Sequence, residues 1–151
     1  MKIYTDIVSG DILISDAFTL KEVNDIAYEV DCAAAEKYNS LDDGVTQRNI
    51  VADSFGLQET FMDKQTWLSH IKDYTKKLLS FLEKNNPDRV KPFRERFPSH
   101  TKQLLADIEK SKFYTGRSNL GDGMICVLRY REDGKTPYFT FWKDGLKTNE
   151  A

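Results

Sequence analysis

The sequence predicts an α+β fold in which a mostly antiparallel, twisted β core carries a projecting antiparallel helical hairpin and a mobile loop. Three observations predict it: strand-like runs rich in β-branched and aromatic residues lie at both ends, two amphipathic segments lie between them, and glycine-containing turns separate the runs. With 151 residues, 40% of them hydrophobic, the chain can bury one core without disulfides. We therefore expect a single domain over residues 1–151.

The first part of the chain is expected to form strands and a loop. Residues 2–18 are rich in β-branched side chains and are broken at Ser9-Gly10-Asp11, which predicts a two-stranded hairpin. A third strand is expected at 26–30, where apolar and polar residues alternate. Residues 31–47 show no sustained period and are expected to form a flexible loop. The run 50–55 is expected to re-enter the sheet as a strand.

The middle of the chain predicts a helical hairpin over residues 63–112, inserted in the β core. The spacing predicts a first helix over 64–84, with Thr60 and Asp63 as its capping pair and Asn85-Asn86-Pro87 as its end. Apolar residues recur there every three or four positions, as Trp67, Ile71, Tyr74, Leu78, Phe81 and Leu82.

The second helix is expected to have its main body at 99–112, with Leu104, Leu105 and Ile108 turned inward. Proline inside a helix removes a backbone hydrogen bond and clashes with the preceding turn. We therefore place Pro92 in a preceding turn and Pro98 at an early helical position, and expect a later helix start or a bend at Pro98.

The last part of the chain is expected to return to strands. Residues 123–131 and 136–142 flank an Asp-Gly turn and predict a β-hairpin. The glycines at 116, 121 and 123 precede a strand rather than a helix, so they indicate a turn and not a phosphate-binding loop.

Charge is distributed unevenly along the chain. The net charge is −2, but residues 1–57 carry −7, residues 58–112 carry +4, and the last 39 residues carry +1. A segment of +4 is modest beside the basic stripes that bind nucleic acid, so nucleic acid is not indicated. Charges interrupt every apolar stretch at the amino terminus, and no segment approaches the roughly 20 apolar residues of a membrane-spanning helix. We expect a cytoplasmic protein with no membrane partner.

The sequence shows no pattern typical of an enzyme or a zinc site. His70 and His100 lie on different expected helices, so they form no i, i+4 ligand pair, and His70 is interpreted as a surface or edge residue. Cys126 lies in an apolar strand, where a thiol is structural, and Cys32 is interpreted as a loop cysteine. Neither belongs to a C-x-x-C pair, so neither zinc binding nor thiol oxidoreductase activity is expected.

Two groups of charged residues are candidates for binding. Scattered acids could supply oxygen ligands to a low-affinity calcium site assembled from separate segments. These acids are Asp11, Asp16, Asp31, Glu36, Asp42 and Asp43. Basic residues of the helix pair could form a docking patch for an acidic partner, or only a solvated face. These basic residues are Lys72, Lys76, Lys77, Arg89, Lys91 and Arg94.

Short motifs in a fixed order run nearly from end to end of the chain. They include Met1-Lys2-Ile3-Tyr4-Thr5-Asp6-Ile7-Val8-Ser9, Leu57-Gln58-Glu59-Thr60, Ile71-Lys72-Asp73-Tyr74, Pro87-Asp88-Arg89-Val90-Lys91-Pro92-Phe93, Phe113-Tyr114-Thr115-Gly116, Tyr130-Arg131-Glu132-Asp133-Gly134-Lys135-Thr136-Pro137-Tyr138 and Phe141-Trp142-Lys143-Asp144-Gly145-Leu146. In these motifs the chain resembles the translationally controlled tumour protein family, also called fortilin or histamine-releasing factor.

The resemblance implies a fold related in shape to zinc-containing exchange-factor-like (Mss4-like) proteins, although this chain lacks the zinc cysteines. It further implies a non-enzymatic cytoplasmic protein that binds calcium and associates with tubulin in microtubules through its basic helical region. Growth regulation, small-GTPase regulation, other regulatory partners and cell survival are further roles that it implies. The chain departs from the family pattern where Ile12 replaces an acidic residue linked to GTPase engagement and where the loop at 32–47 is shorter and less acidic.

Overall fold

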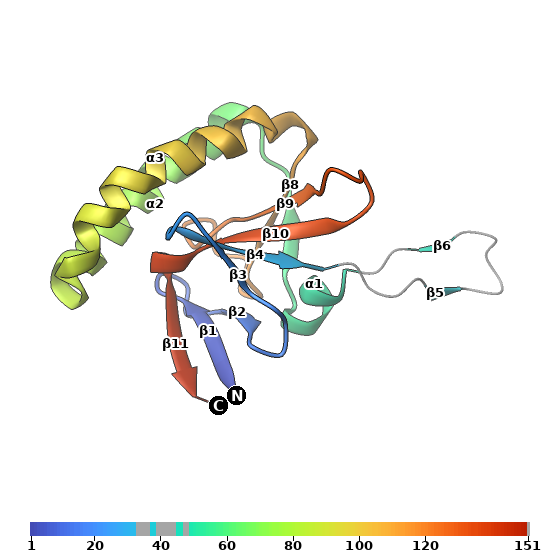
Figure 1. The fold of residues 1–151 in the computed structure, drawn as a ribbon, viewed down its shortest axis with the longest axis horizontal. Helices are drawn as coiled ribbons and strands as arrows, with labels where there is room; N and C mark the ends of the chain where they lie inside the picture. Colours follow the sequence, from blue (N-terminus) through green and yellow to red (C-terminus); the bar gives the residue numbers. More distant parts are fainter. Residues whose placement is uncertain (33–36, 39–44, 47–48, 151) are drawn as a thin grey trace.

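The computed structural model describes residues 1–32, 37–38, 45–46 and 49–150 (Figure 1). Its strands and helices, in chain order, are β1 (Lys2–Asp6), β2 (Ile12–Ser15), β3 (Lys21–Val23), β4 (Ala27–Asp31), β5 (Lys37–Tyr38), β6 (Val45–Thr46), α1 (Ile50–Phe55), β7 (Gln58–Thr60), α2 (Lys64–Asn85), η1 (Pro87–Arg89), α3 (Val90–Ala106), η2 (Ile108–Lys110), β8 (Lys112–Thr115), β9 (Cys126–Tyr130), β10 (Pro137–Trp142), η3 (Lys143–Gly145) and β11 (Leu146–Glu150).

The strands form antiparallel sheets, which confirms the expected fold class. A six-stranded sheet has the order β3-β4-β10-β9-β8-β7, a three-stranded sheet has the order β11-β1-β2, and β5 pairs with β6. Lys2 pairs with Glu150, so the two ends of the chain lie side by side (Figure 1). The hairpins β1–β2 and β9–β10 and the strand β4 are confirmed, whereas β3, β7, β8 and β11 were not anticipated.

The expected strand at 50–55 is wrong, because these residues form helix α1. The side chain of Asn49 accepts a hydrogen bond from the Ala52 amide at 2.9 Å and caps the helix start. Gly56 ends the helix in the left-handed conformation, with φ +66°. These local caps outweigh the strand preference of Ile50 and Val51, and Val51 is buried in the core.

The helical hairpin is confirmed, with one correction to its second helix. Helix α2 begins after Asp63, whose carboxylate accepts from the Thr66 amide at 2.7 Å, whereas Thr60 lies in β7 and does not share the cap. Helix α3 begins at residue 90 instead of 99 and contains Pro98 in its interior. The buried stripe of Phe93, Phe97, His100 and Leu104 stabilises this earlier start, and the ring of Pro98 is exposed. The helix ends at residue 106, and Ile108 is buried in η2.

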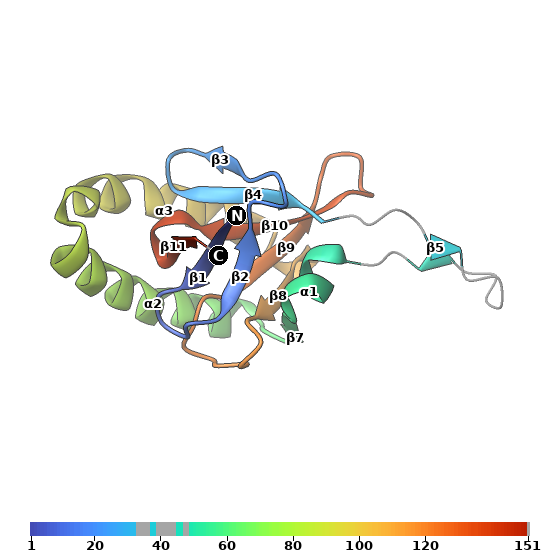
Figure 2. The same cartoon turned by 90° about the horizontal axis from the view of Figure 1, so that it is seen from below.

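Strand β10 runs through the core, and all of its residues are buried, including the polar Thr140. The rings of Trp142 and Phe97 are tilted by 50° with their centroids 4.5 Å apart, and the rings of Phe139 and Tyr114 meet edge to face with their centroids 5.0 Å apart. Successive strand residues point to opposite faces, so β10 is buried on both faces. Figures 1 and 2 show the two helices crossing one side of the β core and projecting beyond it at their connection.

Two further expectations concern the loop and the membrane. The flexible loop expected at 31–47 falls mostly outside the described residues; within them, residue 31 ends β4, and β5 pairs with β6. Among the described helices, none has the length and apolar character needed to cross a bilayer.

Candidate functional site

The exposed side of α2 carries the clearest candidate surface. Lys72 and Lys76 are exposed, because the buried residues of α2 occupy the opposite side of the helix. They are four residues apart and therefore lie one turn apart on the same face. Neither lysine forms an ion pair with another residue of the described ranges. Lys77 is different, since its ammonium lies 3.0 Å from Asp122. We call Lys72 and Lys76 the lysine face.

The basic residues on the connection and on α3 are arranged differently. Lys91 and Arg94 are exposed near the start of α3, and Arg94 lies 3.8 Å from Glu83 of α2. The pair is long and exposed, so it leaves the guanidinium available to solvent and to a partner.

Arg89, at the connection of the two helices, is held by the β core. Its guanidinium donates to both carboxylate oxygens of Asp144, at 2.8 and 2.9 Å, and to the carboxylate of Asp25 at 2.8 Å. Lys143 donates to Asp25 at 2.8 Å, and together with Arg89 it lowers the pKa of Asp25 to about 2. Only 17% of the Arg89 side chain is exposed. We call Arg89, Asp25, Asp144 and Lys143 the anchor cluster.

The candidate calcium ligands are not gathered in the described residues. Asp11 accepts from the backbone amide and the hydroxyl of Ser118, at 3.2 and 2.6 Å. Asp16 is exposed after β2, and Asp31 pairs with Arg131 at 2.8 Å at the end of β4. Glu36, Asp42 and Asp43 lie outside the described residues. Within the part of the chain that the structure describes, no three His, Cys, Asp or Glu side chains are grouped as metal ligands.

The histidines and cysteines are buried, which corrects two expectations. His70 is not at the surface: its ring stacks on Tyr74 at 5.6 Å, and burial lowers its pKa. Cys32 is not a loop cysteine but is buried directly after β4, where its thiol donates to the Pro137 carbonyl at 3.4 Å. Burial raises the pKa of Cys32 to about 12 and that of Cys126 well above its usual value. A reactive thiol needs the opposite shift.

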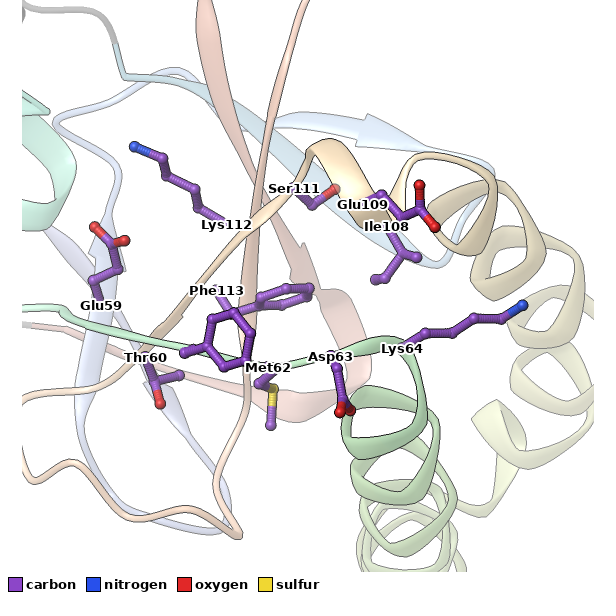
Figure 3. A pocket seen from close by; sticks show the side chains of 11 residues that line it. Glu59, Thr60, Met62, Asp63, Lys64, Ile108, Glu109, Ser111, Lys112 and Phe113 are labelled. Atoms are coloured by element: carbon purple, nitrogen blue, oxygen red, sulfur yellow. The ribbon is translucent and has the colours of Figure 1, made fainter.

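A pocket of about 620 Å³ lies at the base of the hairpin, between residues 59–64 and 108–113 (Figure 3). Met62, Ile108 and Phe113 supply its apolar lining, and Phe61 also lines it although 91% of Phe61 is exposed. Figure 3 shows charged side chains on both sides of the hollow, with Glu59 and Lys112 on one side and Lys64 and Glu109 on the other.

Sequence reasoning missed this pocket, although Phe61 and Met62 supplied a signal. A helix start uses one apolar residue before its cap to pack on the first turn. Two large apolar residues precede Asp63, so one of them is not needed for this packing and is available to line a pocket.

Comparison with known proteins agrees with this architecture. The family model described as translationally controlled tumour protein matches residues 1–147. The homologue from Neurospora crassa is 42% identical, with 100% of both chains covered, and that from Candida albicans is 38% identical, with 99% of both covered. The solved structure of the translationally controlled tumor-associated protein p23fyp from Schizosaccharomyces pombe is 37% identical over 100% of both chains, with a TM-score of 0.85. The chain therefore belongs to the translationally controlled tumour protein family.

Proposed function

We propose that this chain is a non-enzymatic, cytoplasmic binding protein whose helical hairpin docks acidic protein segments, with tubulin in microtubules as the partner. The observation that carries the proposal is the lysine face, where two exposed ammonium groups lie one turn apart without ion pairs among the described residues. Lys77, Lys91 and Arg94 extend the positive charge of the hairpin around it.

The chemistry of such a surface favours an acidic and flexible partner. Exposed charges steer an oppositely charged partner and speed its encounter, and salt screens the attraction over about 8–10 Å. Arg89 is left out of the proposed surface because its donors are already used within the anchor cluster.

The test is co-sedimentation with microtubules at two salt concentrations. Lys72→Glu/Lys76→Glu is expected to reduce the bound fraction severalfold at low salt, because it reverses both charges of the lysine face. Lys2→Glu/Lys147→Glu makes the same change of charge on β1 and β11, outside the hairpin, and is expected to bind as the wild type does. Equal binding by all three proteins would show that the lysine face is only a solvated surface.

Calcium binding stays a prediction, carried by Asp11, Asp16 and Asp31 in the described residues and by Glu36, Asp42 and Asp43 outside them. An amide-resolved NMR titration with calcium, at constant ionic strength and with magnesium as the control, tests it. Saturable shifts confined to residues 11–16 or 31–43 would support a composite oxygen site. Weak, unsaturated shifts shared with magnesium would contradict it.

Regulation of a small GTPase is a second candidate function, favoured by a pocket of about 440 Å³ beside Asp11 and Ile12. Phe55 and Arg117 also line this pocket, so it offers both an apolar surface and a cation to a partner. Nucleotide release from candidate GTPases measures the activity. No acceleration at micromolar protein would contradict it. The roles in growth control and cell survival stay predictions.

A further inference from the structure

The pocket at the base of the hairpin continues around η2. A second hollow, of about 290 Å³, shares Lys64, Ile108 and Glu109 with it. A third, of about 300 Å³, shares Asp107 and Lys110 with the second and extends to the end of β9. The three hollows therefore adjoin one another along residues 107–112, and together we call them the η2 groove.

One end of the η2 groove is apolar and open. Ile108 and Phe113 are buried beneath the pocket, whereas 91% of Phe61 is exposed beside them. An exposed phenyl group next to an apolar hollow can bury most of its surface against one bulky apolar side chain of a ligand. Aromatic side chains placed in this way supply much of the binding energy at protein interfaces.

The charges along the groove favour an acidic ligand. Its lysines, Lys64, Lys110 and Lys112, are exposed and form no ion pair with any residue that the structure describes. Asp107 is already paired with a cation, because it accepts from Arg129 at 3.3 Å. Asp63 accepts from the Thr66 amide at 2.7 Å and keeps its negative charge.

The first pocket is not basic, because Glu59, Asp63 and Glu109 line it together with Lys64 and Lys112. Glu109 is exposed, and Glu59 accepts only a long hydrogen bond, 3.4 Å, from the hydroxyl of Tyr114. The positive charge is in excess at the other end of the groove, where Lys110, Arg129 and Arg131 line the third hollow together with Asp107, and where 43% of Tyr130 is exposed.

We propose that the η2 groove docks a short segment of a partner protein in which one bulky apolar residue is followed by acidic residues. The apolar residue fills the hollow above Ile108 and Phe113 and contacts Phe61, and the acidic residues lie along Lys110 and Lys112. This site is separate from the lysine face, because Lys64 lies at the start of α2, two turns before Lys72. The inference does not depend on microtubule binding.

The experiment is fluorescence anisotropy with a labelled peptide, Ala-Phe-Ala-Asp-Glu-Glu-Ala, amidated at its carboxyl end. Saturable binding that weakens with salt is expected for the wild type. Phe61→Ala is expected to weaken binding about tenfold, and the exposure of Phe61 means that this variant keeps its fold. Lys110→Glu/Lys112→Glu is expected to weaken binding and to reduce its salt dependence.

Matched controls separate this site from other surfaces. Leu120→Ala removes another exposed apolar side chain, in the connection of β8 to β9, and is expected to change the affinity by less than twofold. Lys72→Glu/Lys76→Glu is also expected to bind as the wild type does, and loss of binding in that variant alone would move acidic-segment binding to the lysine face and overturn the proposal. It would be overturned equally by no saturable binding, or by equal affinity for a peptide with Ala in place of Phe or Lys in place of the acids.

Discussion

The helical hairpin carries positive charge in two regions that differ in how the charge is used. In the anchor cluster, Arg89 reaches two carboxylates that belong to the β core, and it fastens the projecting end of the hairpin to that core. On the lysine face, Lys72 and Lys76 are exposed and unpaired among the described residues. The difference shows that basic residues of one segment can have two roles: some form ion pairs that hold the fold together, and others stay exposed and can bind a partner.

The largest expected effect on stability comes from replacing Arg89 of the anchor cluster with an uncharged residue. Arg89→Met is expected to lower the free energy of unfolding by about 3 kcal/mol, because it leaves the carboxylate of Asp144, 5% exposed, buried without its partner. Lys72→Met is the matched control and is expected to change stability by no more than about 0.5 kcal/mol. Urea unfolding of both variants measures the difference. Similar small losses would show that Arg89 is not an anchor.

The anchor cluster also predicts how stability depends on acid pH. Lys143 and Arg89 lower the pKa of Asp25 from 3.8 to about 2, so the folded protein holds this carboxylate charged more strongly than the unfolded chain does. The resulting stability is fully present above pH 3.8 and is lost as the pH falls through about 2. Arg89→Met should therefore lose stability less steeply than the wild type between pH 4 and pH 2. Parallel curves from urea unfolding at each pH would count against this linkage.

The smallest expected effect concerns Lys77. Its charge is paired, unlike those of Lys72 and Lys76, but the pair is more exposed than that of Arg89. Its ammonium is 3.0 Å from Asp122, and both side chains are exposed. Asp122→Asn removes the competing carboxylate and is expected to strengthen microtubule binding about twofold at low salt, with little change at high salt. Glu132→Gln, which removes an exposed acid in the connection of β9 to β10, is the control for net charge. An equal gain from both variants would mean that only net charge matters.

The sequence predicted the features that depend on local pattern. The apolar stripe of α2 has one period over its whole length, and its cap and its terminating proline are adjacent in sequence. Helix α1 was missed because Ile50 and Val51 favour a strand by their intrinsic propensity. The caps at Asn49 and Gly56, which stabilise the helix, do not enter such a propensity argument. The start of α3 was missed because packing of Phe93 and Phe97 on the core overcomes the cost of Pro98.

The candidate site depended on contacts that the sequence does not display. Arg89 looked as available as Lys72, since its partners Asp25 and Asp144 lie 64 and 55 residues away. Phe61 looked like an ordinary apolar residue before a helix cap, and its exposure follows only from the placement of η2 and β8. Contacts between residues far apart in sequence thus determine that Arg89 is paired and that Phe61 is exposed.

The most direct test of this division measures stability and microtubule binding on the same three proteins: the wild type, Arg89→Met and Lys72→Glu/Lys76→Glu. Urea unfolding and co-sedimentation are carried out at a temperature at which all three are folded. The account predicts that Arg89→Met loses stability and keeps its binding, and that the double lysine variant loses binding and keeps its stability. Loss of binding in Arg89→Met with normal binding by the double lysine variant would contradict it.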